Sequence, residues 1–247
     1  MTNIGKEFML KTQHRFLDPS AESLHVPKPP LELACPPDAK RIALPAPSSI
    51  QAPAIDLRAA IEQRRTRRNY APLPLTVEEL AFLLWCTQGV KKVTPRPRTY
   101  RTVPSAGALH AFETYLLCNR VEGLPAGLYR YAAIEHVLLE IDLDPQIGEE
   151  LTLACGNQNQ IRTSAVTFAW VAVTQRMCWR YGERGYRYLH LDAGHVCQNL
   201  YLAAEAIGCG ACAIAAYEDE EVNAALGIDG EEMFAIYLAS LGKRSAD

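Results

Sequence analysis

The chain has 247 residues, with 25 Lys and Arg against 28 Asp and Glu, so its formal net charge is −3 at pH 7. This balance argues against a dedicated nucleic-acid binder, because that class depends on a positive electrostatic field. No apolar run approaches the roughly 18–20 residues that cross a bilayer, and the first ten residues mix Lys6 and Glu7 with a short apolar end, unlike a secretory signal. We therefore expect a soluble cytoplasmic protein that can bury a sizeable core.

Residues 1–53 differ in composition from the rest of the chain. Nine of the 16 prolines fall in this stretch, and proline fixes φ and removes a backbone donor. We expect a Pro-rich N-terminal arm that lies extended over a folded body or is partly disordered. Residues 54–247 are expected to form the folded domain.

Regular elements are predicted from Asp56 onward. Asp56 is suited to cap a short helix that leads into an arginine cluster, and Thr76 opens a capping box before a helix that ends at Gly89. A basic loop is expected over residues 91–101 and a strand over 114–118.

The second half of the sequence alternates strands with helices. We expect an antiparallel hairpin from residues 127–132 and 136–141, and a long helix from about Tyr188 to Ile207 that Gly208 ends in a left-handed conformation. The other predicted elements are a helix near 146–155, a strand over 165–174, a strand over 211–217, a helix over 219–226 and a strand over 233–241. Hairpin and crossover connections together predict an α+β fold.

Two groups of residues have spacings that suggest a metal site. Only Cys209 and Cys212 of the eight cysteines have C-x-x-C spacing, whereas a four-ligand zinc site usually shows two such pairs. His190, Asp192 and His195 form the other group, but residues 190 and 192 of a helix point to different faces. We interpret both groups as core or interface residues and predict no metal site.

Residues 64–68 carry four arginines around Thr66. On a helix, Arg64 and Arg68 share one face and could bind a single phosphate through charge-assisted hydrogen bonds. A solvated basic face is the plainer alternative. A nucleic-acid contact is a third, which the acidic total and the lack of interleaved aromatic residues weaken.

Three other segments are candidates for contact with a ligand. The Pro-Ser-Ala-Gly sequence at 104–107 is small enough for its backbone to approach a flat ligand, and the Gly- and Ala-rich stretch 208–217 shares this property. Lys243 and Arg244 add two cations after the last strand. Dinucleotide-binding, P-loop and hydrolytic signatures do not accompany these segments.

Four motifs in this order resemble the nitroreductase superfamily, and within it the SagB-type dehydrogenases, which include azoline oxidases of modified-peptide biosynthesis. They are R-R-T-R-R-N-Y, P-S-A-G, D-A-G-H-x-x-Q-N-L-Y-L-A-A-E-A-I-G and A-C-A-I-A-A-Y-E-D-E-E-V-N-A-A-L-G-I-D. The resemblance covers about residues 55–244 and leaves the Pro-rich arm outside it. It implies a mixed, mainly antiparallel sheet flanked by helices, in a homodimer that binds two FMN molecules at the subunit interface.

The resemblance also implies roles for individual residues. A phosphate charge near −2 would explain why cations from distant segments converge. The family positions that hold the FMN phosphate and ribityl chain correspond to Arg64, Arg65, Thr66 and Arg68. The late basic pair near the same phosphate corresponds to Lys243 and Arg244. The loop that the other subunit lays against the flavin ring corresponds to Pro104, Ser105, Ala106 and Gly107. The side chain that contacts the pyrimidine edge corresponds to Gln160, or to Gln158 if the register shifts by two. The main-chain position that faces flavin N5 corresponds to Ala215 and Ala216.

Two positions depart from the pattern of the azoline-oxidising branch. That branch is expected to use a Lys-Tyr pair in proton removal, and here Arg180 replaces the lysine while Tyr181 remains. Arginine stays protonated and is a poor general base. Ala216 stands where glycine is usual, which could crowd the ring.

The sequence therefore predicts an FMN-dependent oxidoreductase that transfers a hydride through flavin N5 to or from a small organic or peptide-like substrate, with NAD(P)H as the donor that the family leads us to expect. Tyr181 is the candidate catalytic residue. Two alternatives remain open. One is a peptide azoline (thiazoline or oxazoline) dehydrogenase in which Tyr181 transfers the proton, and the other is a non-catalytic flavin- or partner-binding module that uses the Pro-rich arm.

Overall fold

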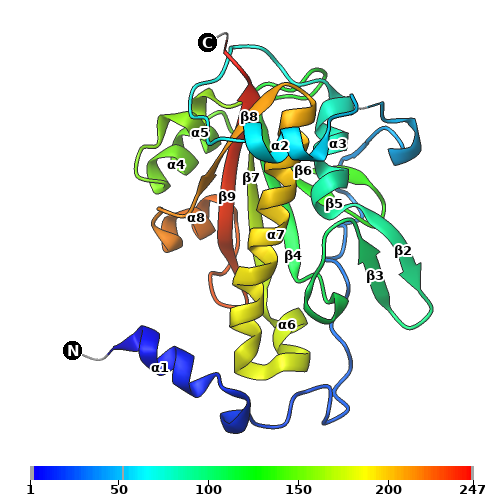
Figure 1. Ribbon diagram of the computed structural model, residues 1–247, viewed down its shortest axis with the longest axis vertical. Coiled ribbons are helices and arrows are strands. Elements are labelled where there is room, and N and C mark those ends of the chain that lie inside the picture. The colour runs from blue at the N-terminus through cyan, green and yellow to red at the C-terminus, as the bar shows by residue number, and fades with distance from the viewer. Residues whose placement is uncertain (1–2, 52, 246–247) are drawn as a thin grey trace.

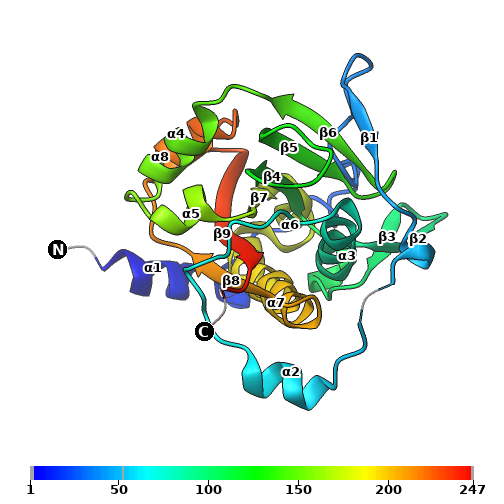
Figure 2. The same ribbon diagram turned by 90° about the horizontal axis from the view of Figure 1, so that it is seen from above.

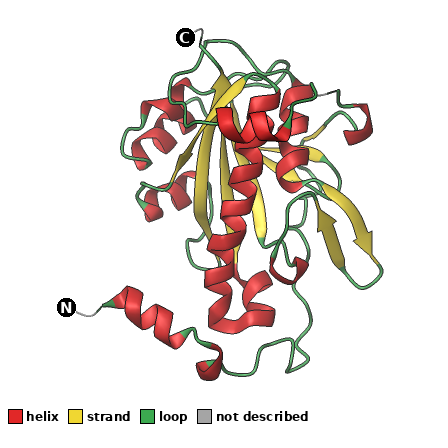
Figure 3. Ribbon diagram, viewed as in Figure 1, coloured by secondary structure: helices red, strands yellow, loops and turns green. Residues whose placement is uncertain are grey.

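A seven-stranded sheet forms the centre of the computed structural model, which describes residues 3–51 and 53–245 (Figures 1 and 3). The strand order is β1-β6-β5-β4-β7-β9-β8, and every neighbouring pair is antiparallel. This confirms the predicted α+β class with a mainly antiparallel sheet. The strands are β1 (Arg41–Ala43), β4 (Phe112–Cys118), β5 (Gly127–Ala132), β6 (Val137–Asp142), β7 (Val166–Val173), β8 (Cys209–Ile214) and β9 (Met233–Lys243), with a separate hairpin of β2 (Val90–Thr94) and β3 (Arg98–Arg101).

Helices cover both faces of the sheet (Figure 2). On one face lie α3 (Val77–Gln88), α6 (Thr174–Tyr181) and α7 (Gly185–Ala206); on the other lie α4 (Ile147–Ala154), α5 (Asn159–Thr163) and α8 (Asp219–Ala225). Successive strand residues point to opposite faces, so Leu116 joins the first core while Tyr115 and Leu117 join the second. The remaining helices are α1 (Ile4–Lys11) and α2 (Leu57–Gln63), and no helix of the described residues is long and apolar enough to cross a membrane.

Three of the predicted helix ends are confirmed, whereas α7 begins at Gly185 and not near Tyr188. The side chain of Asp56 accepts a hydrogen bond from Ala59 N at 3.0 Å and begins α2. Thr76 begins α3 in a complete capping box with Glu79. Gly208, with φ of +68°, follows the end of α7 in the conformation that glycine adopts without a steric penalty.

Other predictions are corrected by the structure. Residues 91–101 are not a loop, because most of them form the β2–β3 hairpin, with Pro95 and Pro97 in its turn where no strand hydrogen bond is needed. The strand predicted over 211–217 starts earlier and ends at Ile214. The sequence analysis also missed α1, α5 and α6.

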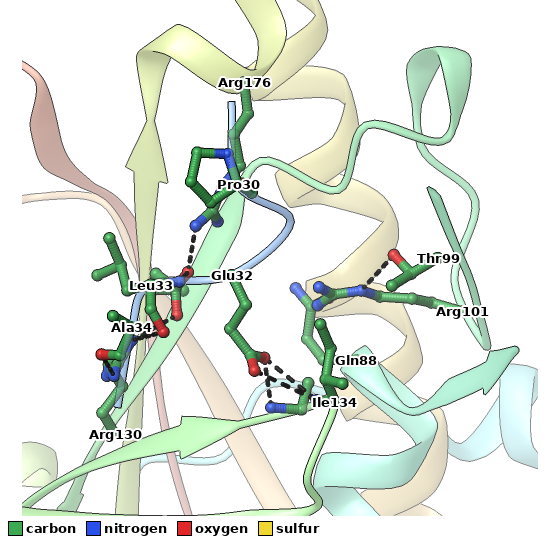
Figure 4. Close-up of polar contacts among 12 residues, drawn as sticks. Pro30, Glu32, Leu33, Ala34, Gln88, Thr99, Arg101, Arg130, Ile134 and Arg176 are labelled. Atoms are coloured by element: carbon green, nitrogen blue, oxygen red, sulfur yellow. Dashed lines mark hydrogen bonds and ion pairs between the residues drawn. The ribbon is translucent and has the colours of Figure 1, made fainter. Parts of the chain in front are cut away.

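The described part of the Pro-rich arm lies along the folded body and is fastened to it. Strand β1 of the arm pairs with β6. Before β1, the carbonyl oxygens of Ala34 and Pro30 accept hydrogen bonds from Arg130 of β5 and Arg176 of α6, each at 2.8 Å (Figure 4). The boundary after residue 53 stays a prediction, but these contacts tie the arm to the sheet.

A buried polar cluster makes this attachment. Its members are Glu32, Arg101, Glu113, Arg130 and Arg176. Glu113 is 2% exposed and pairs with Arg130 at 3.1 Å and with Arg176 at 2.6 Å. Glu32 accepts a hydrogen bond from Ala133 N at 2.6 Å, and its pKa is raised chiefly by burial. Three arginines and Glu113 are thus buried together, with the partly buried Glu32 beside them.

Candidate functional site

The basic segment, residues 64–68, is extended, so the prediction that Arg64 and Arg68 share a helix face is wrong. Helix α2 ends before the segment, and Thr66 forms a parallel bridge with Ala211 of β8. The physical reason is that β8 is the last strand of the sheet, and its outer backbone groups offer hydrogen bonds to an added strand. Pairing between distant residues has overridden the local preference for helix.

The extended segment nevertheless brings the predicted cations together. Beyond it, Tyr70 forms an antiparallel bridge with Arg244, and Ala71 N donates to Lys243 O at 2.9 Å. Gly242 permits this close approach, because a Cβ there would lie 2.9 Å from the Cβ of Tyr70. The basic segment and the C-terminal cations therefore meet at one end of β8 and β9.

The cations at this end differ in their surroundings. Lys243 forms an ion pair with Glu79, and Arg244 forms one with the buried Glu205, so carboxylates of the chain already face both C-terminal cations. The guanidinium of Arg64 lies 5.4 Å from the centroid of the Tyr201 ring. Arg65, Thr66 and Arg68 are exposed to solvent. The segment therefore supplies the cations that face solvent.

Tyr201 of α7 connects the basic segment to β8. Its hydroxyl lies 3.1 Å from Thr66 Oγ1 and accepts a hydrogen bond from Ala213 N at 2.8 Å. The sequence analysis missed this residue, although it stands inside the quoted long-helix motif. Tyr201 thus orients a predicted phosphate-binding side chain.

Both predicted glutamines lie beside the end of β8. Gln160 Nε2 donates to Gln158 Oε1 at 2.7 Å, and Gln158 Nε2 donates to Ala216 O at 2.8 Å. Burial raises the pKa of the Cys212 thiol, while Arg68 and Gln160, which hydrogen-bond to it, oppose that shift. Arg68, Gln160 and the exposed Ala216 therefore surround the same short piece of backbone, and Ala215 lies beside them.

The loop 104–107 belongs to a second group of site residues. The carboxylate of Asp192 accepts a hydrogen bond from Ala106 N at 3.2 Å, and Ser105 Oγ accepts one from His110 N at 2.9 Å. Gly107 has φ of +60°, and a Cβ there would lie only 2.7 Å from Tyr181 Oη. The loop is thus held by α7 and lies against the candidate catalytic residue, with Pro104 exposed at its start.

Asp192 is a site residue that the sequence analysis treated as a polar core residue. It is 4% exposed, and burial raises its pKa while the hydrogen bonds from Ser105 and Ala106 oppose the rise. Asp192 is the first residue of the quoted D-A-G-H motif, so the sequence marked its position. Its hydrogen bond to the 104–107 loop is visible only in the folded structure.

The two groups occupy different stretches of α7. Tyr201 of the first group and Asp192 of the second are nine residues apart, which is about 13 Å along a helix that rises 1.5 Å per residue. One subunit therefore gathers each group but leaves the two groups apart. That the loop faces the β8 end of a second subunit stays a prediction.

Arg180 is held by the Pro-rich arm. Its Nε donates to Glu22 Oε2 at 2.5 Å, and its pKa is raised chiefly by this hydrogen bond and further by Tyr181. A guanidinium with a raised pKa cannot take up a proton, so Arg180 does not replace a catalytic lysine as a base.

Cys209 and Cys212, the two cysteines with C-x-x-C spacing, are both buried, and burial raises the pKa of Cys209 to about 12. Thiols in this state are poor nucleophiles. Among residues 3–51 and 53–245, no group of three or more His, Cys, Asp or Glu side chains is arranged to hold a metal ion.

Comparisons with known proteins agree with this geometry. The sequence profile of the nitroreductase family matches residues 61–243. A Methanocaldococcus jannaschii protein described as a nitroreductase is 35% identical over 190 residues, which are 77% of this chain and 92% of that protein. The trifolitoxin-processing protein TfxB of Rhizobium leguminosarum bv. trifolii is 30% identical over 148 residues, which are 56% of this chain and 40% of TfxB.

A crystal structure described as a nitroreductase from Anabaena variabilis has a similar fold. It matches with a TM-score of 0.69 and 30% identity, over 85% of this chain and 42% of that chain. The chain thus spans less than half the length of the Anabaena protein and of TfxB.

Proposed function

The chain belongs to the nitroreductase family of oxidoreductases, and from this premise we propose that it binds FMN and transfers a hydride between a donor and a small organic or peptide-like substrate. The observation that carries the proposal is the meeting of the basic segment with Lys243 and Arg244 at one end of β8 and β9. A cluster of cations from distant segments is suited to a phosphate. The proposal includes a cytoplasmic homodimer with NAD(P)H as the donor.

The residues at this end of the sheet fit FMN. Arg65, Thr66 and Arg68 are exposed and offer cationic and hydroxyl donors to a phosphate. Ala215 and Ala216 are exposed as well, and their small side chains leave the main chain open to a flat ring. The fit therefore rests on donors for the phosphate and on open backbone for the ring.

Each group of residues has a role in this proposal. Arg64, Arg65 and Arg68 bind the phosphate, where each charge-assisted hydrogen bond contributes roughly 1.5–3 kcal/mol. Gln160 or Gln158 donates to the polar edge of the ring. Bound FMN would supply hydride transfer at N5, and a hydrogen-bond donor near the polar edge of the ring would stabilise the negative charge of the reduced flavin.

The second group acts on the substrate side. Asp192 holds the loop of Pro104, Ser105, Ala106 and Gly107, which a partner subunit lays over the ring and so excludes water. The hydroxyl of Tyr181, next to Gly107, is the group that we propose moves a proton to or from the substrate.

Flavin titration of the purified protein tests the proposal. We expect a yellow protein with one FMN per chain, whose absorbance bleaches with NADPH or NADH and recovers with a nitroaromatic acceptor. Light scattering should give the mass of a dimer. A colourless protein that does not bind added FMN would disprove the proposal.

A peptide azoline dehydrogenase is the second candidate, and the similarity to the trifolitoxin-processing protein favours it. Incubation with an azoline-containing peptide should then remove two hydrogens, which mass spectrometry measures. Arg180 in place of lysine weighs against this candidate. Bound FMN that no donor and acceptor pair can cycle would instead indicate a binding module without turnover.

A further inference from the structure

Glu22 of the Pro-rich arm places a carboxylate beside the candidate catalytic residue. It contacts Arg180 through two oxygens, Oε2 to Nε at 2.5 Å and Oε1 to Nη2 at closer range. Arg180 precedes Tyr181, and its Nη1 lies 3.0 Å from the position that a Cβ of Gly107 would occupy. A planar carboxylate thus binds a planar guanidinium at the edge of the proposed substrate site.

This place carries more positive charge than Glu22 balances. Arg98 of β3 and Lys28 of the arm both act on Glu22, whose pKa is lowered first by the hydrogen bond from Arg180 and, against burial, by these charges. Lys28 is also fixed in position, because its Nζ donates to Pro97 O at 2.6 Å. Arg180 therefore contacts the Glu22 carboxylate directly, and two further cations, held next to each other by the bond from Lys28 to Pro97, act on it through their charge.

The ion pair is not what fastens the arm. Glu22 N donates to Trp179 O at 2.8 Å, and Trp179 Nε1 donates to Val26 O at 2.8 Å. Arg184 adds a bond to Thr12 O at 2.9 Å. Rotation of the Glu22 side chain alone can release Arg180 while these hydrogen bonds persist, because none of them involves the Glu22 carboxylate.

We propose that Lys28, Arg98 and Arg180 form an anion-binding subsite for a substrate carboxylate, and that Glu22 occupies this subsite until the substrate displaces it. The inference rests on the proposed function, since it names the substrate class of the same site. The substrate is then an organic acid or a peptide with a free carboxylate. An intramolecular competitor acts at an effective concentration of millimolar or more, so Glu22 weakens the binding of a carboxylate substrate.

Calorimetric titration with benzoate and its uncharged isostere benzamide tests this proposal. The titrations use the FMN-loaded protein as wild type and as the variants Glu22→Gln, Glu22→Gln with Arg180→Gln, and Asp18→Asn. Asp18 is an exposed carboxylate on the same arm and serves as the matched control. Circular dichroism and flavin absorbance verify that each variant is folded and loaded.

We expect Glu22→Gln to bind benzoate at least tenfold more tightly than wild type, and the added Arg180→Gln substitution to abolish that gain. Asp18→Asn should match wild type, and benzamide should bind to none of the proteins. Equal benzoate affinity in wild type and both Glu22 variants, or equal affinity for benzoate and benzamide, would overturn the proposal. If FMN did not bind, the proposed function would fail, and benzoate would then be titrated into the flavin-free protein under the same criteria.

Discussion

Two arginine clusters of this protein differ in their exposure to solvent. In the buried polar cluster, Glu113 forms ion pairs with both Arg130 and Arg176, and backbone carbonyls of the arm accept hydrogen bonds from the same arginines. In the basic segment, the arginines lie extended along β8 and mostly face solvent. The same residue type thus stabilises the fold where it is buried against a carboxylate of the chain, and lies open to solvent along the last strand of the sheet.

Removal of the charge at the centre of the buried cluster should have the largest effect. Glu113→Gln leaves Arg130 and Arg176 buried without a full counter-charge, which costs about 3–5 kcal/mol in the free energy of unfolding. Denaturant unfolding measures this loss. Glu149→Gln is the control, because its 3.1 Å pair with Arg162 is half-exposed and should be worth less than about 1 kcal/mol. Similar losses in both variants would remove the distinction between buried and exposed pairs.

In the basic segment, we expect a substitution to weaken ligand binding and to leave the free energy of unfolding nearly unchanged. Arg68→Gln should weaken FMN binding by about 10- to 150-fold, because one charge-assisted hydrogen bond of about 1.5–3 kcal/mol is lost. The free energy of unfolding of the flavin-free protein should change by less than about 0.5 kcal/mol. Fluorescence titration of FMN and denaturant unfolding measure the two quantities.

Arg58→Gln is the matched control for this variant, since Arg58 is an exposed arginine on α2 that pairs with Glu62 one turn along the same helix. It should leave both quantities unchanged. An Arg68 variant that unfolds easily but binds FMN normally would place the basic segment with the structural cluster instead.

The effect that is smallest per pH unit concerns His110, a histidine on which the charge of Arg101 in the buried cluster acts. Burial, with the charges of Arg101 and Lys28, lowers the pKa of His110 to about 3. The unfolded chain takes up this proton near pH 6.5 but the folded protein does not, so stability is present above pH 6.5 and is lost as the pH falls. The loss from this residue is at most about 1.4 kcal/mol per pH unit.

His110→Asn should therefore flatten the decline of the unfolding free energy between pH 6.5 and pH 4, and asparagine tolerates the φ of +47° at this position. The control is His25→Asn, because His25 is an exposed histidine that also has positive φ. Identical slopes in wild type and both variants would show that His110 titrates normally.

The sequence predicted best what depends on neighbouring residues. Asp56 and Thr76 cap their helices through bonds to residues three positions on, and Gly208 ends α7 through its own conformational freedom. These features need no knowledge of the fold. The strands β4 to β7 and β9 were recovered for a similar reason, since runs of apolar, β-branched and aromatic residues are local as well.

Prediction from the sequence failed where contacts between residues far apart in the chain determine the local structure or the role of a side chain. The basic segment is extended because Thr66 pairs with Ala211, which lies 145 positions along the chain. Helix α6 has no side-chain cap and follows β7 without a break, so no boundary signal marks it. Asp192 and Glu22 gained their roles only through contacts with the 104–107 loop and Arg180.

The position of the basic segment on β8 has a consequence for solubility. β8 ends the sheet, and an uncovered terminal strand can recruit a strand from another molecule. Thr66 and Arg67 pair with Ala211 along that border, and the positive charge of residues 64–68 repels a second copy that would approach it. The segment that we propose binds the phosphate therefore also opposes aggregation. A mutant that detaches this segment should both lose FMN binding and precipitate.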